Sequence, residues 1–153
     1  MITIISTSIK FYSILGGIDF DTFPVSTLLE STEIISADGR STKSIDLPKP
    51  VAGHAIGSIN DTYSIITGGY NYEELPLDSS WYYNHIAQEF NEGPKLSIAR
   101  RWHSAGALID SGTSKKIPVV TGGKIPGLFP YLDSTIFLID GIWQKGNDLI
   151  FSI

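Results

Sequence analysis

Short apolar runs that end at paired glycines recur along this chain. They are FYSILGG (11–17), YSIITGG (63–69) and IPVVTGG (117–123). Runs of this length, rich in β-branched and aromatic residues and bounded by turn residues, predict β-strands. The doublets recur at intervals of about fifty residues, which predicts an internal structural repeat.

Other features keep the same phase as the doublets. A loop of variable length follows each doublet, and then a small polar or acidic cluster leads into another apolar run: ESTEII, DSSWYY and DSTIFLI. A leucine recurs further on, as Leu47, Leu96 and Leu149, and the first two are followed by His54 and His103. These features predict a degenerate first unit at 1–50, a second at 51–98, and a third unit together with the start of a truncated next one at 99–153, with insertions confined to loops.

The middle unit shows four short strand-like runs, at 54–59, 62–67, 80–84 and about 89–91. The segment SWYYNHIAQEF (80–90) also admits a helix, because it contains neither glycine nor proline. At the equivalent place, the neighbouring units carry Asp38-Gly39 and Asp140-Gly141. Asp-Gly is typical of tight hairpin turns, so a hairpin is favoured over the helix.

Composition excludes several classes of protein. Of the 153 residues, 42% are apolar and 18% are charged, and the formal net charge is −5. No basic stripe is present, so a nucleic-acid partner is not expected. No apolar stretch is long enough for a membrane span. Residues 1–11 are interpreted as a strand rather than a signal peptide, and a cytoplasmic location is expected.

No catalytic, cofactor or metal-binding motif stands out. The chain has no cysteine, which excludes thiolate sites and a cysteine nucleophile. His54 and His103 occupy equivalent repeat positions, so they are expected to be structural rather than catalytic or metal-ligating. His85 has no acidic partner in a recognisable motif. We therefore expect no catalytic residue, no metal and no cofactor.

The repeat resembles the kelch repeat, in which Gly-Gly follows a strand and an aromatic residue lies downstream. The best match is FNEGPKLSIARRWHSAGAL leading to VVTGG, at the junction of the second and third units. The chain departs from the kelch pattern in several places: Val51 stands where an arginine is usual, and Phe90 replaces a tryptophan. The first unit lacks the histidine and also the tryptophan, with Ser41 near its expected position. Trp143 is the expected residue.

The resemblance implies an all-β fold of three four-stranded antiparallel blades of a β-propeller. The first strand of each blade would line the central channel, and the glycines would close the second strand where neighbouring chains approach closely. The residues that carry this structural motif are Gly16, Gly17, Gly68, Gly69, Gly122, Gly123, His54, His103, Phe90 and Trp143.

Three blades cannot close a ring, because propellers generally contain four to eight. The chain is therefore expected to form an incomplete ring. Two explanations stay open. The chain could be part of a longer propeller, which we favour, or two copies could form a homodimer that completes a six-bladed ring.

The loops after the doublets are the expected binding surface. In kelch proteins such loops cluster on one face and contact other proteins. The predicted partner-binding residues are Tyr70, Asn71, Tyr72, Glu73, Phe129, Tyr131 and Arg100. The sequence thus predicts a non-catalytic protein–protein interaction module whose partner is another protein. The alternative is a fragment of a propeller enzyme with sugar-converting or hydrolytic activity.

Overall fold

The computed structural model describes residues 3–6, 11–19, 27–36, 38–127 and 130–149. This part of the chain forms twelve strands, arranged as three four-stranded antiparallel sheets with neighbours in chain order. The first sheet contains β1 (Thr3–Ser6), β2 (Phe11–Asp19), β3 (Thr27–Ser36) and β4 (Ser41–Lys43). The second contains β5 (Ala55–Ser58), β6 (Tyr63–Thr67), β7 (Ser80–Asn84) and β8 (Glu89–Glu92). The third contains β9 (Ser104–Ile109), β10 (Lys116–Thr121), β11 (Thr135–Ile139) and β12 (Ile142–Lys145).

The predicted all-β class is confirmed, and so are the four strands of the middle unit, to within about two residues at each end. The helix considered for residues 80–90 is wrong, because β7 and β8 form a hairpin there. Asn84 closes its turn by accepting bonds from the backbone N–H groups of Ile86 (2.9 Å) and Ala87 (3.0 Å). A local side-chain bond of this kind competes with helix formation.

The tight turn predicted at Asp140-Gly141 is also confirmed. Ile139 pairs with Ile142, so Asp140 and Gly141 alone connect β11 to β12. Both residues have positive φ, 50° and 76°. This is the backbone of a type I′ turn, whose twist matches that of the flanking strands.

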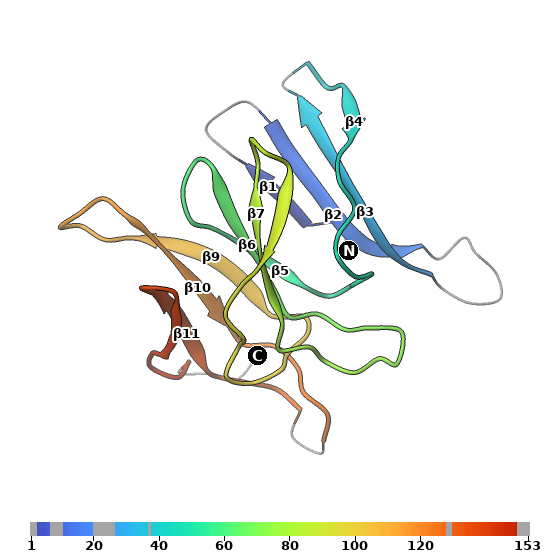
Figure 1. The fold of residues 1–153 in the computed structure, drawn as a ribbon. Helices are drawn as coiled ribbons and strands as arrows, with labels where there is room; N and C mark the ends of the chain where they lie inside the picture. The colour runs from blue at the N-terminus through green and yellow to red at the C-terminus, as the bar shows by residue number, and fades with distance from the viewer. Residues whose placement is uncertain (1–2, 7–10, 20–26, 37, 128–129, 150–153) are drawn as a thin grey trace.

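The three sheets lie side by side in chain order and, over the described residues, do not close a ring (Figure 1). Their first strands are neighbours: β5 contacts β1 on one side and β9 on the other. Each sheet therefore brings its first strand to the same region of the molecule.

The recurring leucines link one sheet to the next. The backbone N–H of Leu47 donates to Glu30 O at the first sheet, while its side chain packs on Ile66 and Tyr83 of the second. Only 4% of Leu47 is exposed. Burying a leucine or isoleucine side chain contributes roughly 1.5–3 kcal/mol, so this contact is a main source of cohesion between sheets.

The same arrangement repeats at the next junction. Leu96 donates to Asp78 O and packs on Val120 and Ile136 of the third sheet. The aromatic residues of the repeat motif support these clusters, since Phe90 packs on the first and Trp143 on the second.

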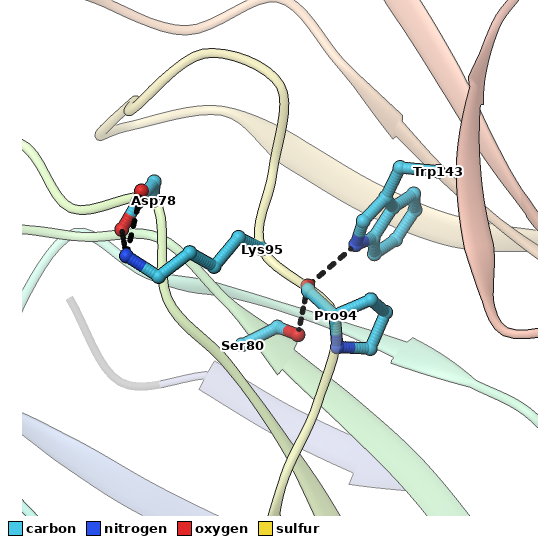
Figure 2. A network of polar contacts seen from close by, with 5 residues as sticks. All are labelled: Asp78, Ser80, Pro94, Lys95 and Trp143. Atoms are coloured by element: carbon cyan, nitrogen blue, oxygen red, sulfur yellow. Dashed lines mark hydrogen bonds and ion pairs between the residues drawn. The ribbon is translucent and has the colours of Figure 1, made fainter.

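A carbonyl group ties the second and third sheets together. Pro94 O accepts bonds from Ser80 Oγ (2.7 Å) on β7 and from Trp143 Nε1 (3.0 Å) on β12 (Figure 2). Beside it, Lys95 pairs with Asp78 at 3.2 Å. Because a buried indole N–H needs a partner, this bond fixes the orientation of Trp143 in its cluster.

Candidate functional site

The first two glycine doublets lie where their sheet meets the segment that leads into the next sheet. Gly17 N donates to Val51 O (3.1 Å), and Gly69 N donates to Arg100 O (2.9 Å). All six doublet glycines have positive φ. Glycine adopts this backbone without the penalty that a Cβ brings, so the doublets allow a close junction.

Arg100 is not available to a partner, contrary to the sequence-based expectation. Its exposed fraction is 0%. Nη1 donates to Gly122 O (3.0 Å), Nη2 to Ser134 Oγ (3.2 Å) and Nε to Ile98 O (3.3 Å). Burial lowers the pKa of Arg100 from its ordinary value. The side chain therefore joins the junction segment to the third sheet, which is a structural role.

The repeat histidines are buried, with His54 4% and His103 7% exposed. His103 Nε2 lies 2.8 Å from the Thr67 hydroxyl on β6. Since that hydroxyl donates its proton to Ala55 O (3.3 Å), the ring N–H of His103 donates to Thr67. Burial, followed by the charges of Arg100 and His54, lowers the pKa of His103 to about 3. Neutral His103 thus connects the second and third sheets.

The buried His103 should make the fold sensitive to acid. Its folded pKa of about 3 lies below the usual 6.5, so the unfolded chain binds the proton more tightly. The stability that neutral His103 contributes is present above pH 6.5 and is lost as the pH falls towards 3. Between pH 7.5 and pH 5 we expect the free energy of unfolding to fall by about 2 kcal/mol.

Urea unfolding at both pH values would measure this loss, with His103→Gln as the matched variant. Gln cannot be protonated, so the pH-dependent loss should shrink by most of that amount. Burial lowers the pKa of His85 in the same direction. The pH-dependent loss of stability from His85 is present in both proteins and therefore cancels when they are compared. Equal pH dependence in wild type and variant would contradict the assignment.

The loop after the second doublet carries four of the predicted partner-binding residues. Tyr72 is 60% exposed, and its hydroxyl donates to Leu28 O (3.0 Å) of the first sheet. Asn71 Oδ1 accepts from the backbone N–H groups of Glu73 (3.1 Å) and Leu75 (3.2 Å). Asn71 therefore shapes the loop, while Tyr72 and Glu73 face outward.

In the loop after the third doublet, Tyr131 is 59% exposed. Phe129 lies outside the described residues. Tyr131 forms a β-bridge with Lys124, which in turn bridges Arg101. The backbone thus brings this loop beside the segment that leads from the second sheet into the third.

Cations and aromatic rings alternate across this region. We call the set the aromatic–cation row; it comprises Tyr70, Arg101, Trp102, Lys124 and Tyr131. Arg101 Cζ lies 5.1 Å from the ring centroid of Tyr70 and 4.4 Å from that of Trp102. Lys124 Nζ lies 5.3 Å from the ring of Trp102 and 5.9 Å from that of Tyr131. Tyr70 and Trp102 also meet edge to face at 5.9 Å.

The environment of Tyr70 shows how closely this row is assembled. Burial raises the pKa of Tyr70 above its ordinary value, while the Arg101 charge opposes the shift and the Glu74 charge supports it. A cation over an aromatic face contributes about 0.5–1 kcal/mol when exposed. The row is therefore held mainly by its backbone, and the cation–π contacts orient the side chains.

Trp102 is the residue that the sequence interpretation missed. It is 51% exposed and has a φ of 55°, which a side-chain-bearing residue rarely adopts. Its backbone N–H donates to Gly53 O (2.7 Å), and its indole ring lies against Gly53. The available signal in the sequence was a tryptophan between Arg101 and the repeat histidine His103. Only the fold shows that about half of this residue is exposed.

One serine–histidine contact bears on the enzyme alternative. Ser64 Oγ lies 2.9 Å from His85 Nε2, the geometry of a nucleophile beside a base. However, Ser64 is only 1% exposed, so a substrate cannot reach the hydroxyl. Among the described residues there is also no group of three or more His, Cys, Asp or Glu placed to hold a metal ion.

The described strands and loops include no helix of the length and hydropathy that a membrane crossing requires. No protein-family model matches the chain, and no curated protein matches its sequence.

Proposed function

We propose that this chain is a non-catalytic protein–protein interaction module built from kelch-type repeats. Residues 1–50, 51–98 and 99–153 would each be one repeat, folded as one propeller blade. The β-sheets, the in-phase glycine doublets and the recurring leucine contacts support this interpretation. The first strands of the sheets are neighbours, as the strands around a propeller channel would be.

The observation that carries the proposal is the exposure of large aromatic residues on the loops beyond the doublets. Tyr72 and Tyr131 on these loops are each more than half exposed, and so is Trp102 on the neighbouring segment that leads into β9. Tyrosine, tryptophan and arginine are the residue types that most often dominate binding at protein interfaces. Their position on loops attached to a fixed β scaffold suits partner recognition.

A second copy of the chain is one partner under this proposal. Two copies could complete a six-bladed ring, in which case light scattering would give twice the 16.7 kDa mass of the chain.

Loss of exposed aromatics should abolish partner capture. The immobilised chain would be incubated with a cell extract, and captured proteins would be quantified by mass spectrometry. The double variant Tyr72→Ala/Tyr131→Ala should lose at least about 90% of the captured partner, because aromatic anchors often contribute 2 kcal/mol or more. Its far-UV circular dichroism should match that of the wild type.

Ile86→Ala is the matched control. Ile86 is 70% exposed, but it lies in the β7–β8 turn, at the opposite end of the second sheet from the doublet. Capture should survive this change. Capture that is equal in all three proteins would refute the loop surface as the binding site.

A further inference from the structure

We propose that the aromatic–cation row binds an acidic segment of a partner protein. This inference rests on the proposed function and specifies the chemistry of its partner. Two cations, Arg101 and Lys124, are interleaved with three rings on one surface. Such a surface offers charge to carboxylates and apolar faces to the chain that carries them.

The two cations have hydrogen-bond donors to spare. Arg101 Nη1 donates to the backbone carbonyl of Glu74 (2.9 Å), the one side-chain bond that the structure shows for this guanidinium. A guanidinium has five N–H donors and an ammonium three. Neither Arg101 nor Lys124 forms an ion pair with any residue in the described part of the chain. The five ion pairs among the described residues use other cations.

The cations are also fixed before a ligand arrives. Arg101 N donates to Lys124 O (3.1 Å), and Lys124 N donates to Arg101 O (2.7 Å), so the two backbones are joined directly. The rings of Tyr70 and Trp102 flank the Arg101 guanidinium. Less side-chain freedom is then lost on binding, which favours affinity.

The local charge contrasts with that of the whole chain. The formal net charge is −5, yet the row carries two cations. The acidic residues nearest to the row in sequence are Asp133, two residues beyond Tyr131, and Glu73 and Glu74 on the loop of Tyr70. Glu74 bonds Arg101 through its backbone carbonyl. The net negative charge of the chain disfavours a long polyanion such as nucleic acid, whereas a short acidic peptide can be confined to the row.

A peptide titration tests this proposal directly. The probe is a fluorescein-labelled glutamate-rich peptide, compared with the same peptide carrying glutamine at each glutamate. Fluorescence polarisation should show the glutamate peptide binding at least about tenfold more tightly, since charge-assisted bonds are roughly twice as strong as neutral ones. Raising the salt from about 50 mM to about 500 mM should weaken that binding.

The decisive variant is Arg101→Gln/Lys124→Gln, which should weaken glutamate-peptide binding at least about tenfold, or about 1.4 kcal/mol. Its control is Lys43→Gln/Lys145→Gln, which makes the same change in net charge at two exposed lysines outside the row. This control should bind the peptide within about twofold of wild type. Arg101→Lys retains the charge and should bind more tightly than the double variant; urea unfolding of every variant would check the fold.

Several outcomes would overturn the proposal: no binding of the glutamate peptide up to about 1 mM, equal binding of the glutamine peptide, or equal loss in the two double variants. Tighter binding of a labelled oligonucleotide than of the peptide would assign the row to nucleic acid instead. The proposed function fails separately, when Tyr72→Ala/Tyr131→Ala leaves partner capture unchanged. Loss of capture in that variant without glutamate-peptide binding would leave an interaction module whose partner is not acidic.

Discussion

Replacing Gly68 with alanine is expected to destabilise the fold by roughly 3 kcal/mol or more. The φ of Gly68 is +56°, a region that a residue with a Cβ enters at a cost of about 1–2 kcal/mol. A Cβ here would also clash with the carbonyl oxygen of Arg100 and lie 2.7 Å from Cε1 of His103. Because that oxygen accepts the Gly69 N–H, the junction cannot widen without losing the bond.

Alanine substitutions at two other glycines distinguish the cost of backbone strain from the cost of steric crowding. Gly39 has a φ of +81° with open space around it, so Gly39→Ala should lose only about 1–2 kcal/mol from backbone strain. Gly106 has no positive φ, and a Cβ added there would have no neighbouring atom within 4 Å. Gly106→Ala should therefore be neutral or stabilise the fold by up to about 1 kcal/mol.

Urea unfolding of the three variants measures the series, and the expected order of loss is Gly68, then Gly39, then Gly106. Equal losses for Gly68→Ala and Gly39→Ala would mean that crowding at the junction contributes nothing. The inference that the close approach at the Gly68-Gly69 doublet requires glycine would then be wrong.

Replacing Arg100 with methionine is expected to lower the free energy of unfolding by about 3 kcal/mol or more. Methionine keeps the length of the side chain but donates no hydrogen bond. Gly122 O, Ser134 Oγ and Ile98 O would lose their partner. A buried polar group left without a hydrogen bond costs about 1–3 kcal/mol.

Arg40→Met is the control, because the Arg40 side chain is exposed and pairs with Asp38 at the surface. Its effect should stay within about 0.5 kcal/mol. Arg100→Lys should fall between the two, since one ammonium cannot reproduce the planar fork of donors. Equal unfolding midpoints for Arg100→Met and Arg40→Met would show that Arg100 does not hold the sheets together.

The strands were predictable because their signals are local. Short runs rich in β-branched and aromatic residues, bounded by turn residues, identified the second sheet, and Asp140-Gly141 identified a tight turn. The helix alternative at residues 80–90 was weaker because it ignored Asn84, whose side chain bonds the turn. Local backbone chemistry of this kind can be read from a short window of sequence.

The candidate site was less predictable, because the exposure of a side chain depends on which residues of the adjoining sheet pack against it. Arg100 and Arg101 are neighbours in sequence and have the same side chain. One is buried against Gly122 and Ser134, while the other lies between the rings of Tyr70 and Trp102. No local pattern distinguishes them, and Arg100 was accordingly assigned to the surface in error.

The sequence by itself determined the period of the repeat, the strands and the places where a Cβ could not be tolerated. These follow from the enrichment of β-branched and aromatic residues between turn residues and from the positive φ that glycine alone adopts freely. The tertiary structure alone decided which cations and rings reach solvent, since burial is set by contacts between residues far apart in the chain. Trp102 shows the difference: its ring lies beside Gly53 from one junction and Lys124 from beyond the next doublet.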